Sequence, residues 1–158
     1  MNEERVSEGT RLDVTSPDRL DALMDIVHDE AFELDDVTFS PQQGIVEIPY
    51  RRIFHGAPSR TIRNWLIFKD IEVDVVRAML RIHHVSDFSF EDTERIGTYS
   101  FNIISYDGRQ LKIVCCEPLE LKMTVSRLFI QSRYLGVRGK ARIRQGLFWE
   151  SWRSQVYD

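Results

Sequence analysis

The stretch Thr98–Glu117, TYSFNIISYDGRQLKIVCCE, is the segment from which the architecture of this chain is predicted most clearly. Two β-rich runs flank Asp107–Gly108, and an Asp-Gly pair between such runs is typical of a tight β-hairpin turn. The following segment, 118–130, alternates apolar and polar residues, as a strand does when one of its faces is buried. Residues 97–131 are therefore predicted to form a three-stranded antiparallel meander.

An amphipathic helix is predicted upstream, at residues 17–30. Ser16 suits the N-cap, Pro17 suits the first helical turn, and Asp18 complements the helix dipole. An apolar stripe runs along one side, with acidic residues on the other; the stripe contains Leu20, Leu23, Met24, Val27 and Ala31. We expect His28 to lie at the edge of this stripe, packed and hydrogen-bonded.

These patterns predict an α+β fold in which the N-terminal helix packs on a curved, mostly antiparallel sheet of six to eight strands. Residues 1–13 are expected to be a flexible lead and 14–135 a single domain. Pro49 indicates an edge or bulged strand. Residues 136–158 are expected to be a basic and aromatic C-terminal extension. Phe148 and Trp152 are four residues apart in it, which favours a short helix.

Composition and cysteine usage favour the cytoplasm. The chain of 158 residues has no apolar segment of signal-peptide length. Its apolar runs are far shorter than the roughly 20 residues that a membrane-spanning helix needs. The two cysteines, Cys115 and Cys116, are adjacent, so a disulfide between them would be strained. We expect both to be reduced and buried.

The histidines are the candidates for metal chemistry, because imidazoles and carboxylates bind zinc or iron. One hypothesis is a metal-assisted hydrolase that uses His28 and Asp29 with His83 or His84. In a strand, however, the rings of His83 and His84 point to opposite faces, so they would not share a metal. Gly139–Lys140 lacks the rest of a nucleotide-binding Walker pattern. We predict no metal, no cofactor and no catalytic residue.

Charge is unevenly distributed along the chain. Residues 1–48 hold 13 acidic side chains against three arginines, whereas the segment between Glu120 and Glu150 holds seven bases and no acid. Bases and aromatic residues alternate there, and such residues anchor protein interfaces. The candidate interaction surface is Arg133, Tyr134, Arg138, Lys140, Arg142, Arg144, Phe148, Trp149 and Trp152. A protein partner or self-association into a homo-oligomer is expected.

Nucleic-acid binding through residues 127–153 is the alternative for the same segment, since bases bind phosphates and aromatic rings stack on nucleobases. The sequence pI of about 5.6 argues against it, because nucleic-acid-binding domains are basic overall.

Two stretches carry a resemblance to known proteins: VHDEAFELDDVTFS at 27–40 and IGTYSFNIISYDGRQLKI at 96–113. A helix that ends in His-Asp, leads into a strand and is followed by an antiparallel meander resembles short bacterial domains, including immunity-type proteins of toxin systems. The resemblance covers about residues 18–131. It implies a non-enzymatic binding role, immunity-like or regulatory, without catalytic residues to carry over.

Overall fold

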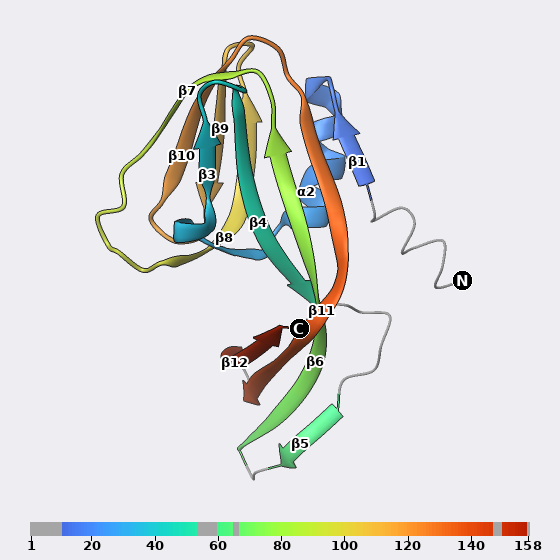
Figure 1. Cartoon of the computed structure of the whole chain (residues 1–158). Coiled ribbons are helices and arrows are strands. Elements are labelled where there is room, and N and C mark those ends of the chain that lie inside the picture. Colours follow the sequence, from blue (N-terminus) through green and yellow to red (C-terminus); the bar gives the residue numbers. More distant parts are fainter. Residues whose placement is uncertain (1–10, 54–59, 65–66, 147–149, 158) are drawn as a thin grey trace. The chain divides into compact units, whose positions relative to one another are not determined.

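A computed structural model describes residues 11–53, 60–64, 67–146 and 150–157 (Figure 1). These residues form a mostly antiparallel β-sheet with one short α-helix. The elements in chain order are β1 (Arg11–Val14), η1 (Pro17–Arg19), α2 (Leu20–Val27), β2 (Ala31–Glu33), η2 (Leu34–Asp36), β3 (Thr38–Ser40), β4 (Ile45–Ile53), β5 (Arg60–Asn64), β6 (Phe68–Ile82), β7 (Val85–Phe90), β8 (Thr98–Tyr106), β9 (Gln110–Cys115), β10 (Glu120–Val125), β11 (Ile130–Gly146) and β12 (Glu150–Tyr157).

The described strands form a sheet of twelve strands that is not closed. Its order is β1-β11-β6-β4-β2-β8-β9-β10-β7, with β3 beside β4, β5 beside β6 and β12 beside β11. The prediction of six to eight strands is therefore wrong. One reason is strand length, since β1, β2 and β3 have only three or four residues each, too few to show an alternating pattern. Another is that β12 lies where a helix was predicted.

The predicted meander is confirmed. Strands β8, β9 and β10 pair antiparallel in sequence order. At the first turn, Asp107 Oδ1 accepts hydrogen bonds from the amides of Arg109 (2.9 Å) and Gln110 (2.7 Å). Gly108 takes a φ of 101°, a conformation that glycine adopts without strain. Hydrogen bonds within the turn itself therefore stabilise it, which is why a short sequence motif was enough to predict it.

The predicted helix at 17–30 is misplaced at both ends. A 3-10 turn occupies Pro17–Arg19, and the α-helix is limited to Leu20–Val27. The helix ends at Val27 because the residues after it form hydrogen bonds with β8. The Asp29 amide donates to the Phe101 carbonyl, and the Phe101 amide donates to the Glu30 carbonyl. Asp29 takes a φ of 64° as the chain turns. Tertiary hydrogen bonds thus replace the last helical turn.

Pro49 lies in an interior strand, which corrects the expectation of an edge strand. Strand β4 pairs with β3 as far as Glu47 and with β2 from Tyr50 onward along the same side. Pro49 lies between these two partners. Because proline has no amide hydrogen to donate, the gap between two short neighbouring strands accommodates it.

Contacts divide the chain into two compact units. Unit 1 comprises the described residues of Met1–Arg51 together with Ala78–Tyr134. It holds the main apolar core, in which α2 buries Leu20, Leu23 and Val27 and packs on β8. The rings of Phe32, Tyr50 and Phe101 are in contact in this core, at centroid distances of 4.8 Å and 5.7 Å from Phe101.

Unit 2 comprises the described residues of Arg52–Arg77 and Leu135–Asp158. Its apolar cluster is small: Ile71, Val73, Val75 and Ile143. The C-terminal segment does not form the predicted short helix, because Glu150–Tyr157 is a strand that pairs antiparallel with β11. A four-residue spacing of aromatic residues carries little weight when a long neighbouring strand offers its hydrogen-bonding edge.

The predicted domains stay a prediction, because these units are defined by contacts alone. The boundary expected at residue 136 lies next to Leu135, where the C-terminal segment of unit 2 begins. That unit also includes 52–77, which the prediction assigned to the main domain. At the other end, β1 takes up Arg11–Val14, so the expected lead of 1–13 overlaps a strand that pairs with β11.

Candidate functional site

The predicted basic and aromatic surface is distributed over both units. Arg133 and Tyr134 lie in unit 1, with Arg133 exposed. The other four bases lie on β11 in unit 2, where Lys140 and Arg142 are exposed. Phe148 and Trp149 lie outside the described residues, as do the side chains of Arg138 and Trp152.

Two of the bases in unit 2 are paired within that unit. Arg144 donates two hydrogen bonds to the Asp70 carboxylate, at 2.8 Å and 3.2 Å, and its guanidinium lies 4.2 Å from the Phe68 ring centre. The hydrogen bonds to Asp70 raise the pKa of Arg144. Lys140 Nζ lies 3.8 Å from Glu72 Oε1. Two bases of the candidate interaction surface are therefore engaged by carboxylates of the same unit.

His28 and Asp29 lie together at the end of α2. Cys116 lies beside them, a contact that the sequence did not predict. His28 Nδ1 is 3.2 Å from Asp29 Oδ2, and the Cys116 thiol donates to Asp29 Oδ1 at 3.6 Å. Desolvation raises the pKa of Cys116, and its contact with Asp29 adds to this. The thiol is therefore held in its protonated form and bonds to a carboxylate, the opposite of an activated nucleophile.

The cysteines differ in burial more than the sequence suggested. Both are free, but Cys116 is exposed and only Cys115 is buried. Burial raises the pKa of Cys115 to about 12. The difference in burial could have been predicted from the adjacency of the two residues, since neighbouring residues of a strand face opposite sides of a sheet.

His83 and His84 form the turn between β6 and β7. The His83 ring stacks on Phe129 at 4.5 Å, and His83 Nε2 bonds to Gln131 Oε1 at 2.7 Å. His84 takes a φ of 59°, and its Nε2 lies 3.0 Å from Arg127 Nη2. The two imidazoles thus have separate partners.

The structure does not bring the four candidate metal residues together. His28 pairs with Phe101, near the start of β8. The His84 carbonyl accepts a hydrogen bond from the Ser126 amide, and the neighbouring Val125 amide donates to the Arg109 carbonyl, beyond the other end of β8. Phe101 and Tyr106 are five residues apart along this strand, about 17 Å. Within the described part of the chain, no three histidine, cysteine or carboxylate side chains are placed to hold a metal ion.

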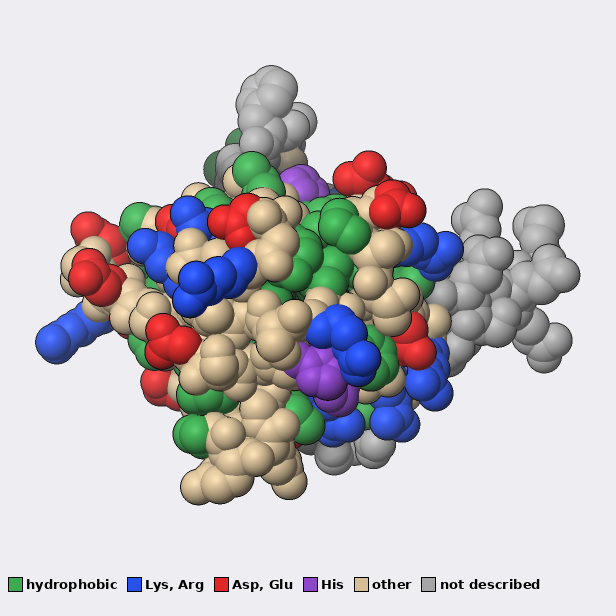
Figure 2. All heavy atoms as spheres, turned by 90° about the horizontal axis from the view of Figure 1, so that it is seen from above, with side chains coloured by type: hydrophobic (Ala, Val, Ile, Leu, Met, Phe, Trp, Pro, Cys, Tyr) green, Lys and Arg blue, Asp and Glu red, His purple; other side chains and the backbone are tan. Residues whose placement is uncertain are grey.

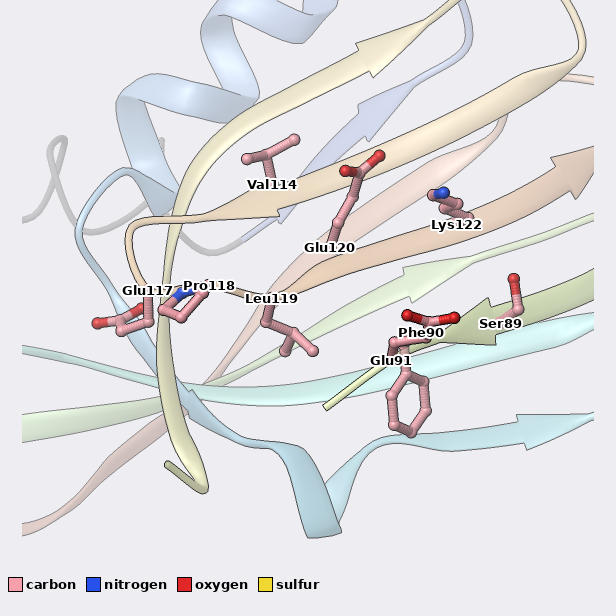
Figure 3. Close-up of a pocket in the computed structure, with 9 residues that line it drawn as sticks. All are labelled: Ser89, Phe90, Glu91, Val114, Glu117, Pro118, Leu119, Glu120 and Lys122. Carbon is pink, nitrogen blue, oxygen red and sulfur yellow. The ribbon is translucent and has the colours of Figure 1, made fainter. Parts of the chain in front are cut away.

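A groove with a volume of about 570 Å³ lies in unit 1 beside the end of β7. Figure 3 shows Ser89 and Glu91 on one side of it, Glu120 and Lys122 of β10 on the other, and the Phe90 ring turned away from Glu91. Its lining also includes Val114, Glu117, Pro118 and Leu119. The groove therefore combines an apolar floor with three carboxylates and one ammonium group.

Strand β7 forms one end of the strand order. It pairs with β10 from Val125↔Val85 to Leu121↔Phe90, and it pairs with no other described strand. Its sequence, VSDFSF, has neither the lysine nor the proline that commonly protects an edge strand from pairing. The sequence did not predict this strand, because three of its six residues are polar, and its place at an edge is not readable from a local pattern.

Comparisons of this chain with protein-family models, with curated proteins and with solved structures find no match. Among the described helices, none has the length and apolar character needed to cross a membrane.

Proposed function

We propose that this chain is a non-enzymatic protein-binding module, immunity-like or regulatory in type, and that its partner binds as an added strand along β7. The observation that carries the proposal is the unpaired edge of β7 beside the groove. An edge strand offers its free amides and carbonyls to an extended segment, while the side chains on either face provide specificity. A cytoplasmic location, suggested by the two free cysteines, belongs to the same proposal.

The side chains of β7 indicate the chemistry of the partner. Alternate residues of a strand face opposite sides, so Asp87 and Ser89 lie on one side, and Glu91, the residue directly after β7, lies on the same side of the groove as Ser89 (Figure 3). Asp87 and Glu91 are exposed, and neither carboxylate has a hydrogen bond or ion pair with another described residue. An added strand with basic side chains opposite these two carboxylates would neutralise both.

The opposite face of β7 is aromatic. The Phe88 ring contacts Phe39 at 5.8 Å and Phe90 at 5.6 Å, and Phe90 is 42% exposed. Apolar side chains of an added strand would cover this exposed ring surface. The partner segment that fits is therefore an amphipathic strand, basic on one face and apolar on the other.

A short peptide that alternates valine and lysine tests this proposal on the full-length protein. We expect it to shift the NMR signals of the β7 amides and to bind about tenfold more weakly when Asp87→Lys and Glu91→Lys are combined. Glu94→Lys is the matched control, because Glu94 is exposed in the following loop, four residues beyond the end of β7.

Two further peptides separate strand addition from simple charge attraction. N-methylation of alternate peptide amides removes the donors that a new strand needs, so it should abolish binding. Replacing lysine by glutamate should also abolish it. Equal binding of the N-methylated peptide, or an equal loss of affinity in Glu94→Lys, would contradict the proposal.

A further inference from the structure

Three connections of unit 1 meet at one end of its sheet. The Ser126 amide donates to the His84 carbonyl at 3.1 Å, and the Val125 amide donates to the Arg109 carbonyl at 2.8 Å. These bonds join the β6–β7 turn, the β8–β9 turn and the start of the β10–β11 connection. Figure 2, which views the molecule from above, shows histidine side chains grouped with lysine and arginine side chains on this face.

Arg127 in this group is paired with a base and not with an acid. Its Nη2 lies 3.0 Å from His84 Nε2. A guanidinium has only donors, so Nε2 of the His84 imidazole is the acceptor in this contact. Within the described part of the chain, Arg127 has no carboxylate partner, which leaves its positive charge without compensation.

Arg109 adds a second uncompensated charge to the same end. Its carbonyl is bonded to Val125, two residues before Arg127, and its exposed side chain has no ion pair with a described residue. The Asp107 carboxylate, two residues away, accepts hydrogen bonds from the Arg109 and Gln110 amides and forms no ion pair with the Arg109 side chain. The concentration of positive charge is notable in a chain whose formal net charge is −4.

One charged neighbour, Asp87 of β7, lies opposite Thr124 and has no ion pair with a described residue, whereas the charged groups beside His83 are engaged with one another. On the side of His83, Gln131 bonds through its Oε1 to His83 Nε2 at 2.7 Å and donates through its Nε2 to Asp13 Oδ1 at 3.3 Å. Asp13 is in turn held by Arg11 at 3.1 Å. This arrangement leaves Arg109, Arg127 and His84 as the groups available to a ligand.

We propose that this end of unit 1 binds a phosphate group through Arg127, Arg109 and His84. A phosphate dianion matches two guanidinium charges, and its oxygens accept the forked hydrogen bonds that arginine makes. With Nε2 of His84 accepting from Arg127, the other ring nitrogen is the donor that His84 offers to the anion. This site is separate from the groove beside β7 and does not depend on the function proposed there.

Titration of the full-length protein with inorganic sulfate and inorganic phosphate, followed by NMR, tests the site. We expect saturable shifts of the amides at 83–84, 108–110 and 126–128.

Variants locate the site and control for general charge effects. Arg127→Gln and Arg109→Gln should each weaken sulfate binding about fivefold. His84→Asn removes the imidazole and should also weaken sulfate binding, and asparagine tolerates the positive φ at this position. Arg95→Gln is the matched control: it removes the same charge from an exposed residue in the β7–β8 loop and should leave binding unchanged.

Non-saturable shifts spread over the surface, or an equal loss of binding in Arg95→Gln, would overturn the proposal. A third titration, with phosphoserine, identifies the source of the ligand. Tighter binding of phosphoserine than of inorganic phosphate supports a phosphorylated partner, and equal binding supports free phosphate.

Discussion

The two units of this chain are stabilised by different kinds of contact. In unit 1 the described residues include an apolar core of 25 buried side chains, fed by α2 and by most of the strands. In unit 2 the described apolar cluster has four side chains, and the Arg144–Asp70 pair and the Phe68 ring lie beside it on the same strands. Unit 1 should therefore respond to the loss of apolar volume, and unit 2 to the loss of a charge.

The largest expected effect is the removal of an aromatic ring from unit 1. Phe101 is fully buried between Phe32 and Tyr50, so Phe101→Ala should lower the free energy of unfolding by about 3–5 kcal/mol. Urea unfolding followed by circular dichroism measures this. Ile103→Ala is the control on the same strand, because Ile103 is 51% exposed and its loss should cost less than about 1 kcal/mol. Similar losses in the two variants would contradict the core assignment.

A smaller effect, confined to unit 2, is expected for Asp70→Asn. The Asp70 and Arg144 side chains are 14% and 24% exposed, so their pair is only partly screened, and its loss should cost about 1 kcal/mol. Hydrogen exchange should speed up for amides of β5 and β12 and stay unchanged in β8–β10. Lys140→Gln is the control, since Lys140 is 56% exposed and 3.8 Å from its partner. Equal acceleration in unit 1 would show that the two units open together.

The next effect concerns pH and a polar contact of unit 1. Hydrogen bonds from the amides of Gln110 and Arg109 hold the pKa of Asp107 below its usual value of 3.8. A lowered folded-state pKa contributes stability above the unfolded-state value, and this stability is lost as the pH falls through the folded-state pKa.

Asp107→Asn should therefore flatten the decline in stability at acid pH. Urea midpoints measured between about pH 5 and about pH 2.5 test this. Glu94→Gln removes a carboxylate from the surface without removing a hydrogen bond to a described residue, so it should keep the wild-type slope. An unchanged slope in Asp107→Asn would mean that the turn survives protonation of its carboxyl group.

The smallest effect is a change in thiol reactivity. Burial, followed by the contact with Asp29, raises the pKa of Cys116, so its alkylation by iodoacetamide near pH 7 should be slow. Asp29→Asn removes the negative charge, keeps a residue that tolerates the φ of 64°, and should raise the rate about twofold. Mass spectrometry of the modified protein follows the rate. Cys115 is the internal control, because burial should keep it unmodified in both proteins.

Local signals in the sequence predicted the parts of the fold that depend on neighbouring residues. The Asp107–Gly108 turn, the alternation in β10 and the apolar stripe of α2 all fall within windows of a few residues. The candidate sites behaved differently. The contact of Cys116 with Asp29 joins residues 87 positions apart, and that of His84 with Arg127 joins residues 43 positions apart. Sequence patterns contain no record of such pairs.

The sequence by itself determined the antiparallel meander, the existence and the buried face of the helix, and the uneven charge. Each of these follows from backbone preference or from hydrophobic periodicity. Only the tertiary structure decided where the helix ends, that Pro49 fits an interior strand, that 150–157 is a strand, and that β7 is an edge. In each of these cases the deciding factor is a hydrogen-bonding partner distant in sequence, or the absence of one among the described strands. Local preferences are small beside it, less than about 1 kcal/mol for most residues.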